Sequence, residues 1–239
     1  MRVCILALCA ALLSAPVSSQ EWVNVDIWGN GILSQTALRH AEEATRQRGR
    51  DSGDSARASA QHRMRTADRL SFQRSADLTG QIEEGVATRL PQLVSLRFRM
   101  DDPSRFVKTA WTRSIYRREL EARRLPENSV SGATALFLAI GWELANGQRL
   151  SPAQNAAIFR QTTSGLQSSP LLRQSHARRQ QESEMRLIIA ALWLEEARAR
   201  TSSARLTKEL SDAVWRDMKT ITSNDMRAYD VTAKGFTER

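Results

Sequence analysis

The sequence predicts an all-α protein, in which a bundle of five to six helices surrounds one buried central helix behind a flexible N-terminal segment. The first observation concerns residues Val130 to Ala145, where only Ser131, Thr134 and Glu143 are polar. A helix that is apolar nearly all round is buried on most sides. The second is that, from Ser75 onward, apolar residues recur at spacings of three and four between helix-capping residues.

The central helix has clear boundary signals. Asn128 or Ser129 can cap its start, and Asn146-Gly147 supplies residues that tolerate the left-handed conformation at its end. Sixteen residues span about 24 Å at about 1.5 Å per residue, which is shorter than the roughly 30 Å hydrocarbon core of a bilayer. We therefore interpret it as a core helix and expect no transmembrane span in the mature chain.

Residues 1–19 read as a signal peptide. Met1-Arg2 precedes an apolar run from Val3 to Leu13, and small residues follow up to Ser19, after which we expect cleavage. An N-terminal membrane anchor is the alternative, for which the apolar run is short. Both cysteines, at positions 4 and 9, fall inside this signal. We expect a protein exported through Sec to the periplasm or beyond, without disulfides in its mature form.

Residues 20–74 form the predicted N-terminal segment ahead of the helical domain. Trp22 and Trp28 lie in an extended stretch that either docks on the helical body or contacts a protein partner. Between Arg46 and Arg74, eight arginines stand against three aspartates, which is typical of a basic, flexible linker. With Phe72 as its one aromatic residue, this stretch disfavours nucleic acid as a partner.

Residues 75–239 form the predicted helical domain. Its helices are expected over Ser75–Leu90, from the cap at Asp102-Pro103 to about Arg124, over Val130–Ala145, from the capping box Ser151–Gln154 to Gly165, from Ser169-Pro170 to about Arg200, and from Ser203 onward. In the second helix, the residues expected to face inward are Phe106, Val107, Ala110, Trp111 and Ile115. The tail after Asn224 is expected to fold back onto the body through Tyr229, Val231 and Phe236.

Four motifs suggest a relationship to known proteins. The runs SVSGATALFLAIGWELANGQ, LSPAQNAAIFRQTTSGL, RLIIAALWLEEARA and DVTAKGF resemble a family of exported bacterial proteins whose domain has no assigned function. The resemblance covers roughly Leu90 to Phe236. It implies a signal peptide, a variable N-terminal region and a helical domain, and it carries over no catalytic residue.

Glu143 is the first candidate site residue. Gly132, Ala135, Ala139 and Glu143 lie along one stripe of the central helix, where small residues allow a close helix contact. An apolar setting raises the pKa of a carboxyl group, so Glu143 could act as the general acid of a cell-wall glycan hydrolase. Glu195 or Glu196 would then supply the second carboxylate. The alternative is a structural ion pair.

The second candidate is an arginine-rich helix face formed by Arg113, Arg117, Arg118, Arg123 and Arg124. Such a face is either solvated and laced with ion pairs or docks on an anionic glycan or lipid surface. The formal charge of +9 favours affinity for anionic polymers. His40, His62 and His176 are too dispersed to predict a metal site, and we expect no cofactor. The leading hypothesis is therefore a non-enzymatic envelope protein that binds a partner protein or an anionic envelope polymer.

Overall fold

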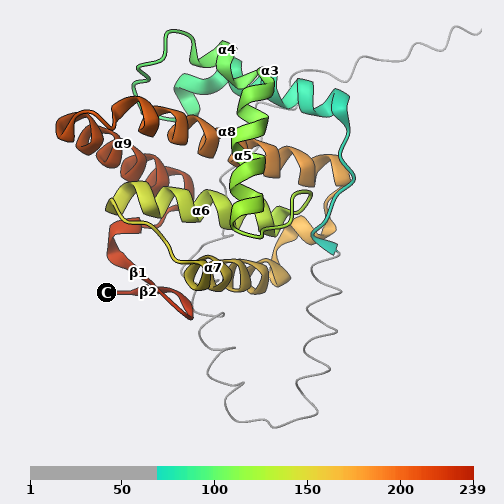
Figure 1. Ribbon diagram of the computed structural model, residues 1–239. Helices are drawn as coiled ribbons and strands as arrows, with labels where there is room; N and C mark the ends of the chain where they lie inside the picture. The colour runs from blue at the N-terminus through green and yellow to red at the C-terminus, as the bar shows by residue number, and fades with distance from the viewer. Residues whose placement is uncertain (1–68) are drawn as a thin grey trace, which may run out of the picture.

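The computed structural model describes residues 69–239, so the predicted signal peptide, Trp22, Trp28 and most of the basic linker lie outside the described residues. The described part is a helical bundle, which confirms the predicted fold class (Figure 1). Its α-helices are α3 (Ala76–Leu93), α4 (Pro103–Val107), α5 (Ala110–Ala122), α6 (Val130–Asn146), α7 (Pro152–Gly165), α8 (His176–Arg200) and α9 (Ala204–Thr222).

Helix α6 is the centre of the bundle, as predicted. It begins after Ser129, whose side chain accepts the N–H of Gly132, and ends at Gly147, whose φ of 64° is left-handed. All of its residues except Leu144 and Asn146 are buried, and it packs chiefly against α8, α9 and α7. Within the described residues, no helix combines the length and apolarity needed to cross a membrane.

Two glycines of α6 allow neighbouring atoms to approach its backbone closely. A Cβ added to Gly132 would overlap the carbonyl oxygen of Pro126, and one added to Gly141 would press on the side chain of Met218 in α9. Ala139 is 1% exposed. Small residues on α6 therefore let neighbouring segments approach closely, as the stripe suggested, although Gly141 lies outside the stripe.

The predicted end of the first helix at Leu90 was too early. Pro91 lies inside α3, which continues to Leu93. Proline lacks an N–H, so the carbonyl four residues earlier loses its helical donor. That carbonyl belongs to Ala87, and it accepts a hydrogen bond from the Ser104 hydroxyl at 3.0 Å instead. Ser104, which is distant in the sequence, thus replaces the hydrogen bond that Pro91 cannot donate, and the helix continues.

The single helix expected from Asp102 to Arg124 is two helices. Asp102 caps α4 with Pro103 at its first position, as predicted, but α4 ends at Val107 and Thr109 caps α5. The Thr109 hydroxyl also donates to the carbonyl of Phe106 at 2.8 Å, and such local bonds compete with helix continuation. The break rotates α5, so that Trp111 is 47% exposed and Ala110 is exposed, contrary to the prediction.

The helix expected from Ser169 to Arg200 also starts later. Ser169-Pro170 opens a 3₁₀ helix, Pro170–Arg173, and α8 begins only after Ser175, whose side chain accepts the N–H of Arg178. The short helix buries Leu171, which packs in a small apolar cluster with Leu70, Phe72, Val130 and Leu166. Burial of Leu171 and the second serine cap together account for the interruption.

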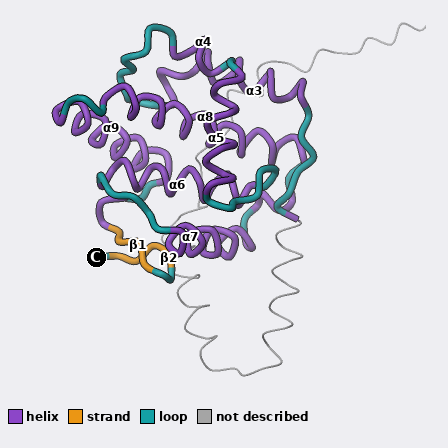
Figure 2. Tube along the Cα trace, viewed as in Figure 1, coloured by secondary structure: helices purple, strands orange, loops and turns teal. Residues whose placement is uncertain are grey.

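Both ends of the described chain pack on the bundle. At the C-terminus, Tyr229–Thr232 and Gly235–Glu238 form the antiparallel pair β1 and β2, drawn in orange in Figure 2. Tyr229, Val231 and Phe236 are buried, as predicted, although the hairpin itself was not foreseen. At the other end, Leu70 and Phe72 exchange backbone hydrogen bonds with Val130 and Asn128 at 3.0 Å each. The packed body therefore begins at or before Leu70, ahead of the expected boundary at Ser75.

Candidate functional site

Glu143 lies in a buried ionic cluster. Its Oε1 and Oε2 accept hydrogen bonds from Nη1 and Nη2 of Arg123 at 3.0 and 2.9 Å, and Oε1 also accepts the N–H of Leu150 at 2.9 Å. Its side chain is 5% exposed and that of Arg123 is 7% exposed. Arg149 adds a longer contact at 3.3 Å. In all of these contacts Glu143 accepts the hydrogen bond, whereas a general acid must donate one.

The two carboxylates proposed to pair with Glu143 belong elsewhere. Glu196 is fully buried and binds Arg200 at 2.9 Å, and Glu195 pairs with Arg198 at 3.1 Å on the surface. Among the described residues, neither shares a hydrogen-bonding partner with Glu143. The structure therefore brings Glu143 together with arginines, and its geometry is that of a structural ion pair.

The five arginines proposed as a docking face do not form one free surface. Arg113 pairs with Glu83, and Arg117 pairs with Glu127 at 2.8 Å. Arg123 points into the core toward Glu143. Arg118 stacks on the exposed ring of Trp111, with its guanidinium carbon 4.8 Å from the ring centroid. Arg124 is exposed with a positive φ at the end of α5. Three of the five charges are thus neutralised by carboxylates within the bundle.

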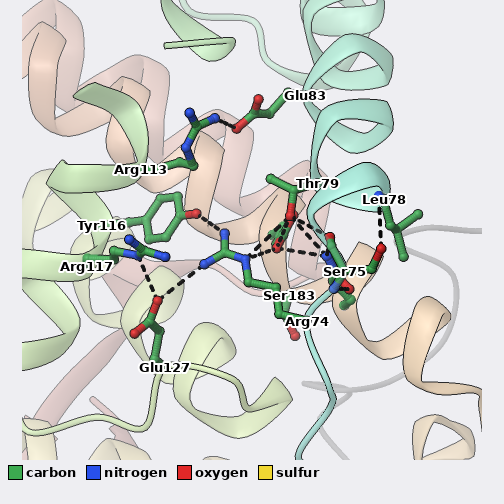
Figure 3. Close-up of polar contacts among 12 residues, drawn as sticks. Arg74, Ser75, Leu78, Thr79, Glu83, Arg113, Tyr116, Arg117, Glu127 and Ser183 are labelled. Atoms are coloured by element: carbon green, nitrogen blue, oxygen red, sulfur yellow. Dashed lines mark hydrogen bonds and ion pairs between the residues drawn. The ribbon is translucent and has the colours of Figure 1, made fainter. Parts of the chain in front are cut away.

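A second ionic cluster, centred on Arg74, holds the segment that precedes α3 (Figure 3). Arg74 donates to the hydroxyl of Tyr116 at 2.6 Å and pairs with Glu184 at 2.8 Å and Glu127 at 3.3 Å. Burial raises the pKa of Glu184 and of Tyr116. Burial alone would lower the pKa of Arg74, but the charges of Tyr116 and Glu184 outweigh it and the pKa is raised. These contacts hold the segment before α3 against α5 and α8.

A third group of buried ionic contacts lies beside an open pocket. The connection from Val94 to Met100 contains neither helix nor strand, and its side chains alternate between a buried and an exposed face. Leu96 is 6% exposed and Phe98 packs against the core, whereas Arg97 and Arg99 point outward. This segment, the end of α8 and the face of α9 enclose a pocket of about 410 Å³, here called the Arg97 pocket. In Figure 1 the α3–α4 connection is the loop at the upper left, near α9.

Buried charged groups hold this segment by its backbone. Asp217 of α9 accepts the N–H of Ser95 at 2.7 Å, and Glu196 of α8 accepts the N–H groups of Arg99 and Met100 at 2.8 and 3.1 Å. Arg200 donates to the carbonyl of Arg97. Burial raises the pKa of Asp217 although Ser95 hydrogen-bonds to it. The segment is therefore fixed without using the side chains of Arg97 and Arg99.

The Arg97 pocket carries an excess of positive charge. Arg97, Arg99 and Arg216 line it, and within residues 69–239 none of them forms an ion pair. Its one acidic lining residue, Glu209, pairs with Arg205 at 3.0 Å. The buried guanidinium of Arg200 is neutralised by Glu196. The charge of Arg216 also acts on the buried Asp217. Three arginines that line one concave site without a salt bridge among residues 69–239 are suited to bind phosphate or carboxylate.

Sequence reasoning missed this site although its signal was present. The run Leu96-Arg-Phe-Arg-Met100 alternates apolar and basic residues, which places both arginines on one face of an extended segment. The contribution of Arg216 could not be anticipated, because it depends on the packing of α9. No group of three or more potential ligands among residues 69–239 is arranged to hold a metal ion.

Comparisons with known proteins give no relative for this chain: no protein-family model, curated protein or solved structure matches it. The resemblance of residues 90–236 to exported helical proteins therefore stays a prediction.

Proposed function

We propose that this protein is a non-enzymatic binding module that takes an anionic partner at the Arg97 pocket. The observation that carries the proposal is that three arginines, Arg97, Arg99 and Arg216, line one pocket without ion-pair partners among the described residues. Elsewhere in the bundle, buried arginines such as Arg123 and Arg186 are neutralised by glutamates. Uncompensated charge in a concave site attracts and retains anions.

The setting we propose is the cell envelope, where anionic glycans and lipids are abundant. Support comes from the predicted signal peptide at residues 1–19 and from the positive net charge of the chain. N-terminal sequencing of the exported protein should find a mature end at or near Gln20. A membrane-bound protein that still begins with Met1 would contradict this part of the proposal.

Retention on lipopolysaccharide-coated resin tests the binding function with the full mature chain. Electrostatic contacts are screened by salt, so retention should fall steeply between about 20 and 200 mM salt. The double variant Arg97→Gln/Arg99→Gln should be retained several-fold less at low salt. The matched control is Arg105→Gln/Arg173→Gln, because both residues are exposed, lie outside the pocket and form no ion pair within residues 69–239.

The comparison between the two double variants decides the outcome, because the basic residues between Arg46 and Arg74 add charge of their own. Equal retention of both variants would overturn the assignment to the Arg97 pocket. Retention that does not respond to salt would overturn the electrostatic mechanism. In that case the predicted segment with Trp22 and Trp28 becomes the place to search for a protein partner.

A further inference from the structure

The Arg97 pocket is apolar on the side that its arginines do not cover. Leu96, Phe98, Leu206 and Ala213 contribute to its lining. Ala213 is 4% exposed and belongs to the apolar core, against which Phe98 also packs. A site for a free inorganic anion needs only donors and charge, so an apolar wall of this kind points to a ligand with an apolar part.

We infer that the pocket takes a single amphipathic anion, with a phosphate or carboxylate headgroup joined to an apolar chain. This inference rests on the proposed function and names its ligand class. The volume of about 410 Å³ lies within the roughly 300–1,000 Å³ of small-molecule sites. A bilayer surface or a glycan strand would instead be matched by charges spread along a face.

The arginines are placed to hold such a headgroup. Arg97 and Arg99 are two residues apart in the connection between α3 and α4, and both are exposed. Arg216 approaches from α9. Guanidinium groups bind carboxylate and phosphate oxygens in pairs, and groups on separate elements can contact different oxygens of one headgroup. The apolar chain then lies toward Leu206 and Ala213.

The backbone of the pocket is held in place by groups of the protein itself. Ser95, Arg99 and Met100 are held by backbone hydrogen bonds to buried carboxylates of α9 and α8. A site whose backbone is already ordered loses less conformational entropy on binding.

Calorimetric titration of the full mature chain with three soluble probes tests the inference. The probes are octyl phosphate below its micelle concentration, inorganic phosphate and 1-octanol. Each buried methylene contributes about a fourfold gain in affinity, so octyl phosphate should bind more than about 100-fold more tightly than inorganic phosphate. It should also bind far more tightly than 1-octanol, which lacks the charge.

Two variants locate the two parts of the ligand. Arg97→Gln/Arg99→Gln should lower the affinity for octyl phosphate about tenfold or more, whereas Arg105→Gln/Arg173→Gln should leave it within about twofold. Leu206→Gln, at a partly exposed position of α9, should reduce the advantage of octyl phosphate over ethyl phosphate. Unchanged thermal unfolding of each variant shows that a loss of affinity is not a loss of fold.

The possible failures are distinct. Equal affinity for octyl phosphate and inorganic phosphate would overturn the amphipathic ligand and leave the anion-binding function intact. The amphipathic ligand is likewise overturned if anionic phosphatidylglycerol vesicles bind through Arg97 and Arg99 but monomeric octyl phosphate does not. If no probe binds and retention on lipopolysaccharide does not depend on these arginines, both the inference and the proposed function fail.

Discussion

Arg123, the residue that follows α5, and Glu143 of α6 form an ion pair with two hydrogen bonds, at 3.0 and 2.9 Å, and their side chains are 7% and 5% exposed. The same guanidinium also binds Glu119 at 3.2 Å and the side-chain oxygen of Asn155 at 2.8 Å. One arginine therefore joins α5, α6 and α7, and removing its main partner would leave a buried charge with weaker compensation.

We predict that Glu143→Gln lowers the free energy of unfolding by about 3–5 kcal/mol, since breaking a buried pair leaves one charge uncompensated. Denaturant unfolding of both proteins measures the difference. Glu195→Gln is the matched control, because Glu195 and Arg198 form a surface pair, 30% and 50% exposed, and such pairs contribute about 1 kcal/mol or less. Equal effects would contradict the structural role of Glu143.

The burial of Asp217 predicts a pH dependence of stability. The pKa of Asp217 is raised mainly by burial, so the folded protein binds this proton more readily than the unfolded chain does. The stabilising contribution is then fully present below the ordinary aspartate pKa of about 3.9. It is lost as the pH rises through the raised value.

Asp217→Asn removes this titration and keeps an oxygen for the Ser95 bonds. The free energy of unfolding of the unmodified protein relative to Asp217→Asn should therefore fall as the pH rises from about 4 toward neutrality. Urea unfolding at several pH values measures this difference. Asp230→Asn is the control on an exposed aspartate, which is 59% exposed. A difference that stays constant with pH would contradict the prediction.

Truncation at the N-terminus tests where the packed body begins. Leu70 and Phe72 are 0% and 6% exposed, and burial of each such side chain contributes about 1.5–3 kcal/mol. A chain that begins at Ser75 should therefore melt at a clearly lower temperature than one that begins at Arg69. Calorimetry of the two fragments gives the comparison. Identical melting temperatures would contradict this prediction and place the start of the packed body at Ser75.

Two glycines in helices predict opposite effects of one substitution. Gly132→Ala should destabilise the protein by roughly 1–3 kcal/mol or more, because the new Cβ meets the Pro126 backbone. Gly80→Ala in α3 should stabilise it by up to about 1 kcal/mol, because the added Cβ has no neighbour within 4 Å. Thermal unfolding of both variants measures the signs. A stabilising Gly132→Ala would refute the close contact at the start of α6.

Local sequence patterns were sufficient to predict the helical class, the buried central helix and most helix starts. Ser129, Ser151 and Ser203 cap helices where they were expected to, because a cap depends only on residues within one turn. The apolar residues of α6 allowed no other placement than the core. Gly147 ends this helix for an equally local reason.

Where a local sequence signal competes with a contact to a distant residue, only the tertiary structure decided the outcome. Pro91 does not end α3 because Ser104 satisfies the carbonyl that the proline leaves without a donor. Glu143 is an ion-pair partner because Arg123 reaches it from another helix. The Arg97 pocket forms because buried carboxylates of α8 and α9 fix an irregular segment by its backbone. These contacts join residues far apart in the chain, whereas hydrophobic periodicity and capping motifs depend only on residues within one helix.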